Sequence, residues 1–115
     1  MTDDDVANRL SALANVHRLR IFRLLVADGG DGMLAGDLAE QCGMPPSNLS
    51  FHLTHLVHAG LISSVREGRN IRYSLNIEAT RETLEFLIGD CCGGRPELCS
   101  PALAAAIPEL NTKGA

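Results

Sequence analysis

The chain has 115 residues, a formal net charge of −4 at pH 7 and 45% hydrophobic residues, which fits one globular domain. The N-terminal sequence MTDDDVANRL is acidic and lacks the apolar segment of a secretion signal, and no apolar run is long enough to cross a membrane. We therefore expect a cytoplasmic protein without a membrane partner, in which the cysteines stay reduced.

The charge is unevenly distributed along the chain. Residues 41–77 contain Arg66, Arg69 and Arg72 against Glu67 alone, a net charge of +2, so the acidic excess lies elsewhere. A locally basic segment can bind phosphates while the acidic parts of the protein face away from them. The overall acidity therefore does not exclude nucleic acid as a partner.

Three amphipathic segments are predicted in the first half of the chain. Apolar residues recur at helical spacing over residues 7–26, and the sequence DGGDG then ends the helical run. Residues 34–43 place Cys42 on an apolar face and end at Gly43, which is typical of a helix C-terminus. Residues 47–60 follow two prolines and form a helix whose apolar face contains Leu49, Leu53, Leu56 and Val57.

The periodicity changes after residue 60. Residues 61–76 alternate apolar and polar side chains around the sequence EGRN, which predicts a β-hairpin with a basic tip. Residues 77–92 return to helical spacing, with an apolar stripe formed by Leu84, Leu87, Ile88 and Cys91. Ser100 and Pro101 are typical of the start of a short helix, which Pro108 would end.

The order helix, glycine-containing turn, helix and basic hairpin predicts a winged helix-turn-helix fold, mainly α-helical with a β-hairpin. In this fold the second of the two helices enters the major groove of DNA. Its side chains that point away from the apolar face or lie near its N-terminus are Ser47, Asn48, Ser50, Phe51, Thr54, His55 and His58. A solvated helix face is the alternative interpretation, but the order of the elements favours DNA binding.

Three histidines of this helix, His52, His55 and His58, are spaced three residues apart. Their directions spread over about 120° of the helix, so at most a neighbouring pair could share a metal ion. We interpret His52 as a boundary residue that makes a hydrogen bond. The other two histidines are expected to face solvent or DNA.

The sequence PSNLSFHLTHLVHAGLISSVREGRNIRYSL, residues 46–75, resembles the core of the ArsR/SmtB-type bacterial repressors. Upstream, ALANVHRLRIFRLL resembles the second helix of that family and LAGDLAEQCGMPPSNLS resembles its helix-turn, so the resemblance covers roughly residues 9–90. It implies a homodimeric repressor of transcription, in which the first and last core helices pack across the dimer and operator DNA is the partner.

The resemblance also implies roles for individual residues. The operator contacts of the helix would be Ser47, Asn48, Ser50, Phe51 and Thr54. In the wing, the basic residues would be Arg66, Arg69 and Arg72. The dimer interface would contain Leu84, Leu87 and Ile88.

Two sensing sites of the family are missing from this sequence. The familiar arsenic sensors carry a Cys-x-Cys pair in the first helix of the helix-turn-helix, where this chain has Cys42 alone. We expect Cys42 to pack in the core as a small apolar side chain. The zinc sensors of the family use Asp and His pairs along the last helix, which contains no histidine in this chain.

The remaining thiols are Cys91, Cys92 and Cys99, in the sequence DCCGGRPELC. Three thiolates without a nearby histidine suit the soft trivalent ions As(III) and Sb(III), which take three sulfur ligands. Gly93 and Gly94 allow the backbone to open after the helix, so that Cys99 can return to the pair. This C-terminal arrangement is similar to that of a subgroup of arsenic-responsive repressors. We therefore predict a DNA-binding and dimerisation domain over residues 1–90 and a sensing tail over residues 91–115.

Several alternatives stay open at this point. Cd(II) or Pb(II) could be the inducer, the thiols could form a redox switch, or the tail could be inert in a constitutive DNA-binding dimer. A small thiol enzyme is disfavoured, because the chain has neither a Cys-x-x-Cys motif nor a βαβ framework. We hypothesise that the protein is a metal-binding repressor of the arsenical-resistance type, which As(III) or Sb(III) releases from its operator.

Overall fold

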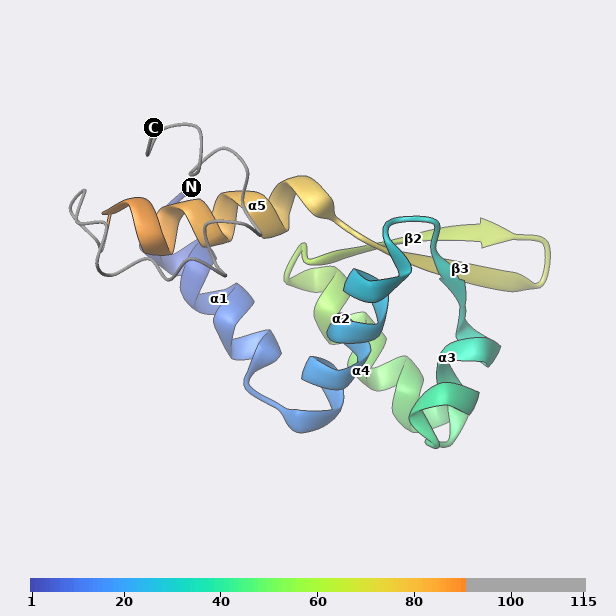
Figure 1. Cartoon of the computed structure of the whole chain (residues 1–115). Helices are drawn as coiled ribbons and strands as arrows, with labels where there is room; N and C mark the ends of the chain where they lie inside the picture. Colours follow the sequence, from blue (N-terminus) through green and yellow to red (C-terminus); the bar gives the residue numbers. More distant parts are fainter. Residues whose placement is uncertain (91–115) are drawn as a thin grey trace. The chain divides into compact units, whose positions relative to one another are not determined.

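The structure is a computed structural model and describes residues 1–90, so the cysteine-bearing tail and its predicted short helix lie outside the described residues. The described elements, in chain order, are α1 (Asp3–Leu13), α2 (Val16–Asp28), β1 (Met33–Leu34), α3 (Ala35–Cys42), α4 (Pro46–His58), β2 (Ile62–Glu67), β3 (Asn70–Leu75), α5 (Ile77–Glu85) and a π-helix (Phe86–Asp90) (Figure 1). The described residues divide into two units, residues 1–79 and the segment that begins at residue 80. None of the helices in the described part is long and apolar enough to span a bilayer.

The N-terminal helical run is divided into α1 and α2, whereas the sequence predicted one run over residues 7–26. Asn15 is the reason for the break. Its side-chain oxygen accepts hydrogen bonds from the backbone N–H groups of His17 (2.9 Å) and Arg18 (3.2 Å), which caps the start of α2. Helical spacing of apolar residues continues across such a break, so periodicity alone does not locate it.

The start of α1 is fixed by a capping box. The Thr2 hydroxyl accepts a hydrogen bond from the Asp5 N–H (3.2 Å), and the Asp5 carboxylate accepts one from the Thr2 N–H (3.0 Å). The hydrogen bonds from Thr2 lower the pKa of Asp5. The acidic N-terminus therefore has a structural use, because it begins a helix.

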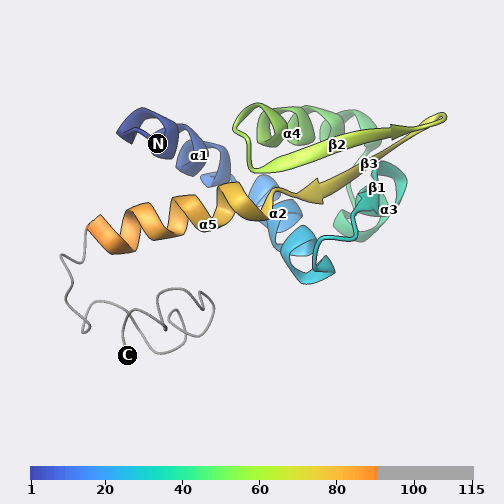
Figure 2. The same ribbon diagram turned by 90° about the horizontal axis from the view of Figure 1, so that it is seen from above.

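The predicted β-hairpin is confirmed and is joined by a strand that the sequence did not predict. The sheet is antiparallel with the order β1-β3-β2, and the pairing of Glu67 with Asn70 leaves Gly68 and Arg69 as a two-residue turn. Gly68 has φ +64°, as such turns require. In Figure 2 the tip of the β2–β3 hairpin extends beyond α4, as a wing does.

The added strand, β1, has only two residues and pairs with β3, so no alternating pattern could have revealed it. Gly32 directly precedes it and allows the close approach of the two segments. A Cβ at this glycine would lie 2.8 Å from the Arg72 side chain and 3.2 Å from the carbonyl oxygen of Tyr73. The Asp28 carboxylate accepts a hydrogen bond from the Gly32 N–H at 2.6 Å and thereby fixes the loop.

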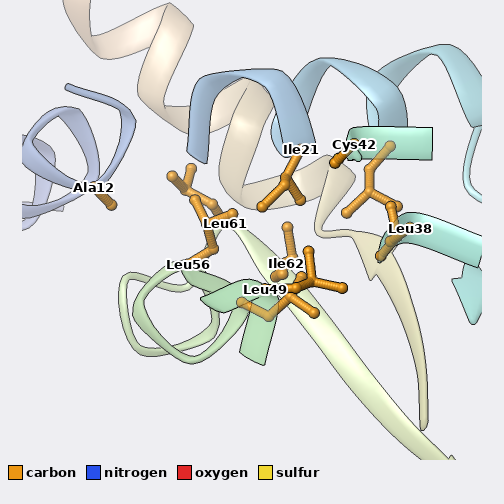
Figure 3. Close-up of a cluster of buried hydrophobic side chains, with 10 residues drawn as sticks. Ala12, Ile21, Leu38, Cys42, Leu49, Leu56, Leu61 and Ile62 are labelled. Carbon is orange, nitrogen blue, oxygen red and sulfur yellow. The ribbon is translucent and has the colours of Figure 1, made fainter. Parts of the chain in front are cut away.

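The core of the first unit lies between α2, α3, α4 and the base of the hairpin (Figure 3). Its buried residues are Ala12, Ile21, Leu25, Leu38, Cys42, Leu49, Leu53, Leu56, Leu61 and Ile62. The predicted inward faces of α3 and α4 are thus confirmed, and so is the burial of Cys42. The mainly helical winged helix-turn-helix fold is confirmed as well.

The last described helix differs from its prediction. Helical spacing over residues 77–92 predicted one α-helix, but the α-helix ends at Glu85 and a π-helix follows from Phe86 to Asp90. Residues 86–88 are three consecutive apolar residues, so one of them faces the apolar side whether the segment winds as an α-helix or as a π-helix. The sequence pattern therefore does not require α-helical geometry here. The predicted domain boundary between residues 90 and 91 falls at the end of the described residues and stays a prediction.

Candidate DNA-binding surface

The helix-turn-helix is formed by α3, a short turn and α4. Helix α3 ends at Gly43, whose backbone is left-handed with φ +63°, and the prolines at positions 45 and 46 begin α4. Pro45 is the N-cap residue and cannot cap the helix with its side chain, so the N–H groups of the first turn are not satisfied in that way. Such a helix start attracts phosphate groups.

The predicted contact residues of α4 lie together on its exposed side. We call this set the recognition surface; it consists of Ser47, Asn48, Ser50, Phe51 and Thr54, all of which are exposed. Leu49, Leu53 and Leu56 on the opposite side are 1% exposed or less. Phe51 is 66% exposed and places a large aromatic ring among these polar side chains. The arrangement agrees with the prediction, while contact with DNA itself stays a prediction.

The three wing arginines have different surroundings. Arg66 and Arg69 are exposed at the tip, where Arg66 Nε donates a hydrogen bond to the Gly68 carbonyl oxygen at 3.3 Å. Arg72 lies in the middle of β3, opposite Val65, and forms an ion pair with Glu67, with an Nε–Oε2 distance of 2.8 Å. Its Nη1 also donates to the Gly32 carbonyl oxygen at 3.1 Å.

These contacts show that Arg72 stabilises the wing. The hydrogen bond and charge of Glu67 raise the pKa of Arg72, and the bond to Gly32 ties β3 to the loop before β1. The tip arginines are therefore better placed than Arg72 to offer their charge to a phosphate. Sequence spacing could not separate the three, because all of them lie in one short hairpin.

The histidines of α4 also have separate environments. His55 and His58 are exposed, whereas His52 is half-buried with its Nδ1 at 3.4 Å from Nη1 of Arg18. The interpretation of His52 as a boundary residue with a polar partner is confirmed. Arg18 is itself buried, which the sequence analysis missed, because a basic residue within an amphipathic helix is normally expected at the surface.

No group of three or more His, Cys, Asp or Glu side chains within residues 1–90 could hold a metal ion. Burial raises the pKa of the Cys42 thiol, so this cysteine is neither ionised nor accessible at neutral pH. The predicted sensing thiols, Cys91, Cys92 and Cys99, lie outside the described residues.

The predicted dimer-interface residues lie on either side of the change from α-helix to π-helix. Leu84 is in α5, and Leu87 and Ile88 are in the π-helix. Leu84 and Leu87 are half-buried and Ile88 is buried in the single chain. Their role at an interface stays a prediction.

A helix-turn-helix with a buried apolar side, an exposed recognition surface and a wing with a basic tip define a winged helix-turn-helix DNA-binding protein. The profile of a family described as "Helix-turn-helix domain" matches residues 13–65. The transcriptional repressor SdpR of Bacillus subtilis is 36% identical over 81 residues, covering 70% of this chain and 87% of SdpR. The chain therefore belongs to the ArsR/SmtB family of transcriptional regulators, which confirms the resemblance at the level of the family.

Solved structures agree with this assignment. NolR from Sinorhizobium fredii is 35% identical, covers 75% of this chain and 83% of its own, and superposes with a TM-score of 0.60. The homodimeric winged helix-turn-helix domain Mb0332 from Mycobacterium bovis is 26% identical, covers 81% and 90% of the two chains, and gives a TM-score of 0.62. The protein is accordingly a DNA-binding regulator of transcription and not an enzyme, as predicted.

Proposed function

We propose that the protein is a homodimeric repressor that binds operator DNA through α4 and the wing and leaves it when As(III) or Sb(III) binds. The observation that supports operator binding is the recognition surface, which places polar groups and one exposed aromatic ring next to a helix start without a side-chain cap. The wing adds the exposed charges of Arg66 and Arg69. Together these features offer both base-edge and phosphate contacts.

The proposed homodimer is supported by a structural relative and by the spacing of half-sites on DNA. Mb0332 is homodimeric, and two copies of a recognition helix can read half-sites about 34–36 Å apart, one turn of DNA. We assign Leu84 and Leu87 to the interface, because they keep apolar surface exposed in the single chain, and Ile88 because the family resemblance implies it.

The inducer is inferred from the thiols. The chain has four cysteines, and Cys42 is unsuited to capture an ion because it is buried and its pKa is raised. Cys91, Cys92 and Cys99 remain, within nine residues of one another. When bound, As(III) or Sb(III) would link the three sulfurs and hold together two ends of a segment that directly follows the predicted dimer helix.

Release from DNA requires that the ligand-bound protein bind the operator more weakly by at least a few kcal/mol. Cys91 follows the π-helix directly, so constraint of the thiols acts on the end of the helix that carries Leu87 and Ile88. A change in the dimer there would alter the separation or freedom of the two recognition helices.

The proposal is tested by titrating the full chain onto the DNA upstream of its own gene, with fluorescence anisotropy as the measurement. The titration is repeated with arsenite, antimonite, Cd(II), Pb(II) and Zn(II), and with peroxide followed by a reductant. We expect release by arsenite and antimonite. Release by Cd(II) or Pb(II) alone would identify a divalent-ion sensor, and release by peroxide with recovery by the reductant would identify a redox switch. Absence of binding to that DNA and to any other duplex would contradict the proposal altogether.

A further inference from the structure

Arg18 is a buried cation at the junction of three helices. Its side chain is 9% exposed, and its Nε donates a hydrogen bond of 2.6 Å to the carbonyl oxygen of Ala12, near the end of α1. Its Nη1 lies 3.4 Å from Nδ1 of His52 in α4. No carboxylate among residues 1–90 pairs with this guanidinium. A buried charge of this kind is costly unless hydrogen bonds replace the water that it loses, and here the bonds to Ala12 and His52 do so.

The contact with Arg18 determines which nitrogen of His52 carries its proton. A guanidinium can only donate hydrogen bonds, so Nδ1 of His52 must accept, and the neutral ring then carries its hydrogen on Nε2. Burial, followed by the charge of Arg18, lowers the pKa of His52, which keeps the ring neutral near pH 7. Nε2–H is therefore a donor with a fixed orientation, and no residue in the described part of the chain accepts from it.

The surroundings of His52 are basic and adjoin the recognition surface. The centroid of the His17 ring, in the first turn of α2, lies 5.4 Å from that of the His52 ring. The centroid of the Phe51 ring also lies 5.4 Å from that of His52, and these two rings meet edge to face. The groups that act electrostatically on His52 are Arg18 and His17 from α2 and His55 from α4, and all of them are basic. His52 also follows Asn48 by one helical turn, on the same side of α4.

We propose that His52 and His17 bind a phosphate of the operator backbone, with Arg18 as the positioning residue that aims His52. The DNA-binding surface then extends from α4 to the first turn of α2. A phosphate offers several acceptor oxygens and suits a site that has N–H donors, positive charge and no carboxylate. This inference rests on the proposed function, because it adds one contact to the proposed binding of operator DNA.

Two substitutions of His52 separate positioning from phosphate binding. In His52→Asn the amide oxygen lies near the place of Nδ1 and can accept from Arg18, but the outer donor is lost. In His52→Gln the amide nitrogen lies near the place of Nε2 and keeps the outer donor. His17→Ala removes the exposed partner, and Asn8→Ala, at an exposed position of α1 outside the recognition surface and the wing, is the control.

Affinities of the full-chain variants for the operator and for a scrambled duplex are measured by anisotropy, together with unfolding by urea. We expect His52→Asn to weaken binding to both duplexes by roughly tenfold and His17→Ala by a few-fold, because phosphate contacts carry no sequence information. His52→Gln should restore much of the affinity, and Asn8→Ala should bind as the wild type does.

The outcomes distinguish this inference from the proposed function. Failure of the wild type to bind the operator overturns both. Wild-type binding with unchanged affinity in His52→Asn and His17→Ala overturns only the phosphate site. Equal losses of affinity in His52→Asn and His52→Gln, each with a matching loss of unfolding free energy, would show that His52 is purely structural. A loss confined to the operator would show that His52 contacts a base instead.

Discussion

Helix α4 and the segment Ile77–Asp90 are two amphipathic helices with similar apolar spacing but different structures. Helix α4 is α-helical throughout, and its leucines are almost completely buried within the first unit. The later segment changes from α-helix to π-helix, and Leu84 and Leu87 stay half-buried. The comparison shows that equal spacing does not mean equal burial. The apolar side of α4 is complete in one chain, whereas the later segment keeps apolar surface for which we propose a second subunit.

The largest expected effect is on stability, and it distinguishes the apolar side of α4 from that of the segment Ile77–Asp90. Leu53→Ala should lower the free energy of unfolding by about 2–5 kcal/mol at any protein concentration, because it leaves a cavity in the core of one chain. Leu87→Ala should instead raise the dimer dissociation constant, so its effect on stability should depend on concentration. Urea unfolding at several protein concentrations, with sedimentation to measure association, tests the distinction. A concentration-independent loss for Leu87→Ala would place that residue in a core and not at an interface.

The next effect concerns the exposed side of α4. Phe51→Ala should weaken operator binding by roughly tenfold, the loss typical of one good base contact, while it changes stability by less than about 0.5 kcal/mol. Anisotropy and thermal unfolding are the measurements. Thr54→Ala is a smaller truncation on the same surface and should have a weaker effect. If Phe51→Ala bound as tightly as the wild type, the recognition surface would have to lie elsewhere on the protein.

A smaller effect is expected at the tip of the wing. Arg69→Ala should reduce the salt dependence of DNA binding by about one phosphate contact and weaken specific and non-specific duplexes alike. Arg72→Ala should mainly disturb the wing, because Arg72 pairs with Glu67 and bonds to Gly32. Affinities measured at several salt concentrations would show this. An unchanged salt slope for Arg69→Ala would exclude a phosphate contact at the tip.

The smallest expected effect is a pH dependence of the unfolding free energy, caused by His52 in α4. The pKa of His52 is lowered from its ordinary value of 6.5, so the unfolded chain takes up this proton more readily than the folded protein. The contribution of His52 to stability should therefore be complete above pH 6.5 and decrease as the pH falls through that value towards the lower folded-state pKa. Urea unfolding of the wild type and of His52→Gln across pH 5 to 8 measures it. Identical pH profiles for the two proteins would contradict the assignment.

Sequence patterns predicted the parts of the fold in which periodicity is tied to burial. The faces of α3 and α4, the burial of Cys42 and the β2–β3 hairpin all follow from regular spacing, and all are present. The break at Asn15 depends on one side-chain cap, and β1 is too short to show a pattern. The π-helix was missed because consecutive apolar residues fit two windings equally well.

The candidate site shows the same division. The recognition surface could be predicted because exposure on α4 is the complement of its buried leucines. The link between Arg18 and His52 could not be predicted, since the two residues are 34 positions apart and come together only through packing of α2 against α4. Different surroundings of Arg69 and Arg72 likewise depend on the register of β2 with β3.

The central claim is that operator binding by α4 is controlled by the thiols that follow the later helix. The most direct test is the operator affinity with and without arsenite, measured in parallel for the wild type, the triple variant Cys91→Ser/Cys92→Ser/Cys99→Ser and the control Cys42→Ser. All three proteins should bind the operator without arsenite. Arsenite should weaken binding by about a hundredfold or more for the wild type and for Cys42→Ser and leave the triple variant bound. The account would be contradicted if arsenite released the triple variant from the operator. It would also be contradicted if Cys42→Ser stayed bound to the operator in the presence of arsenite.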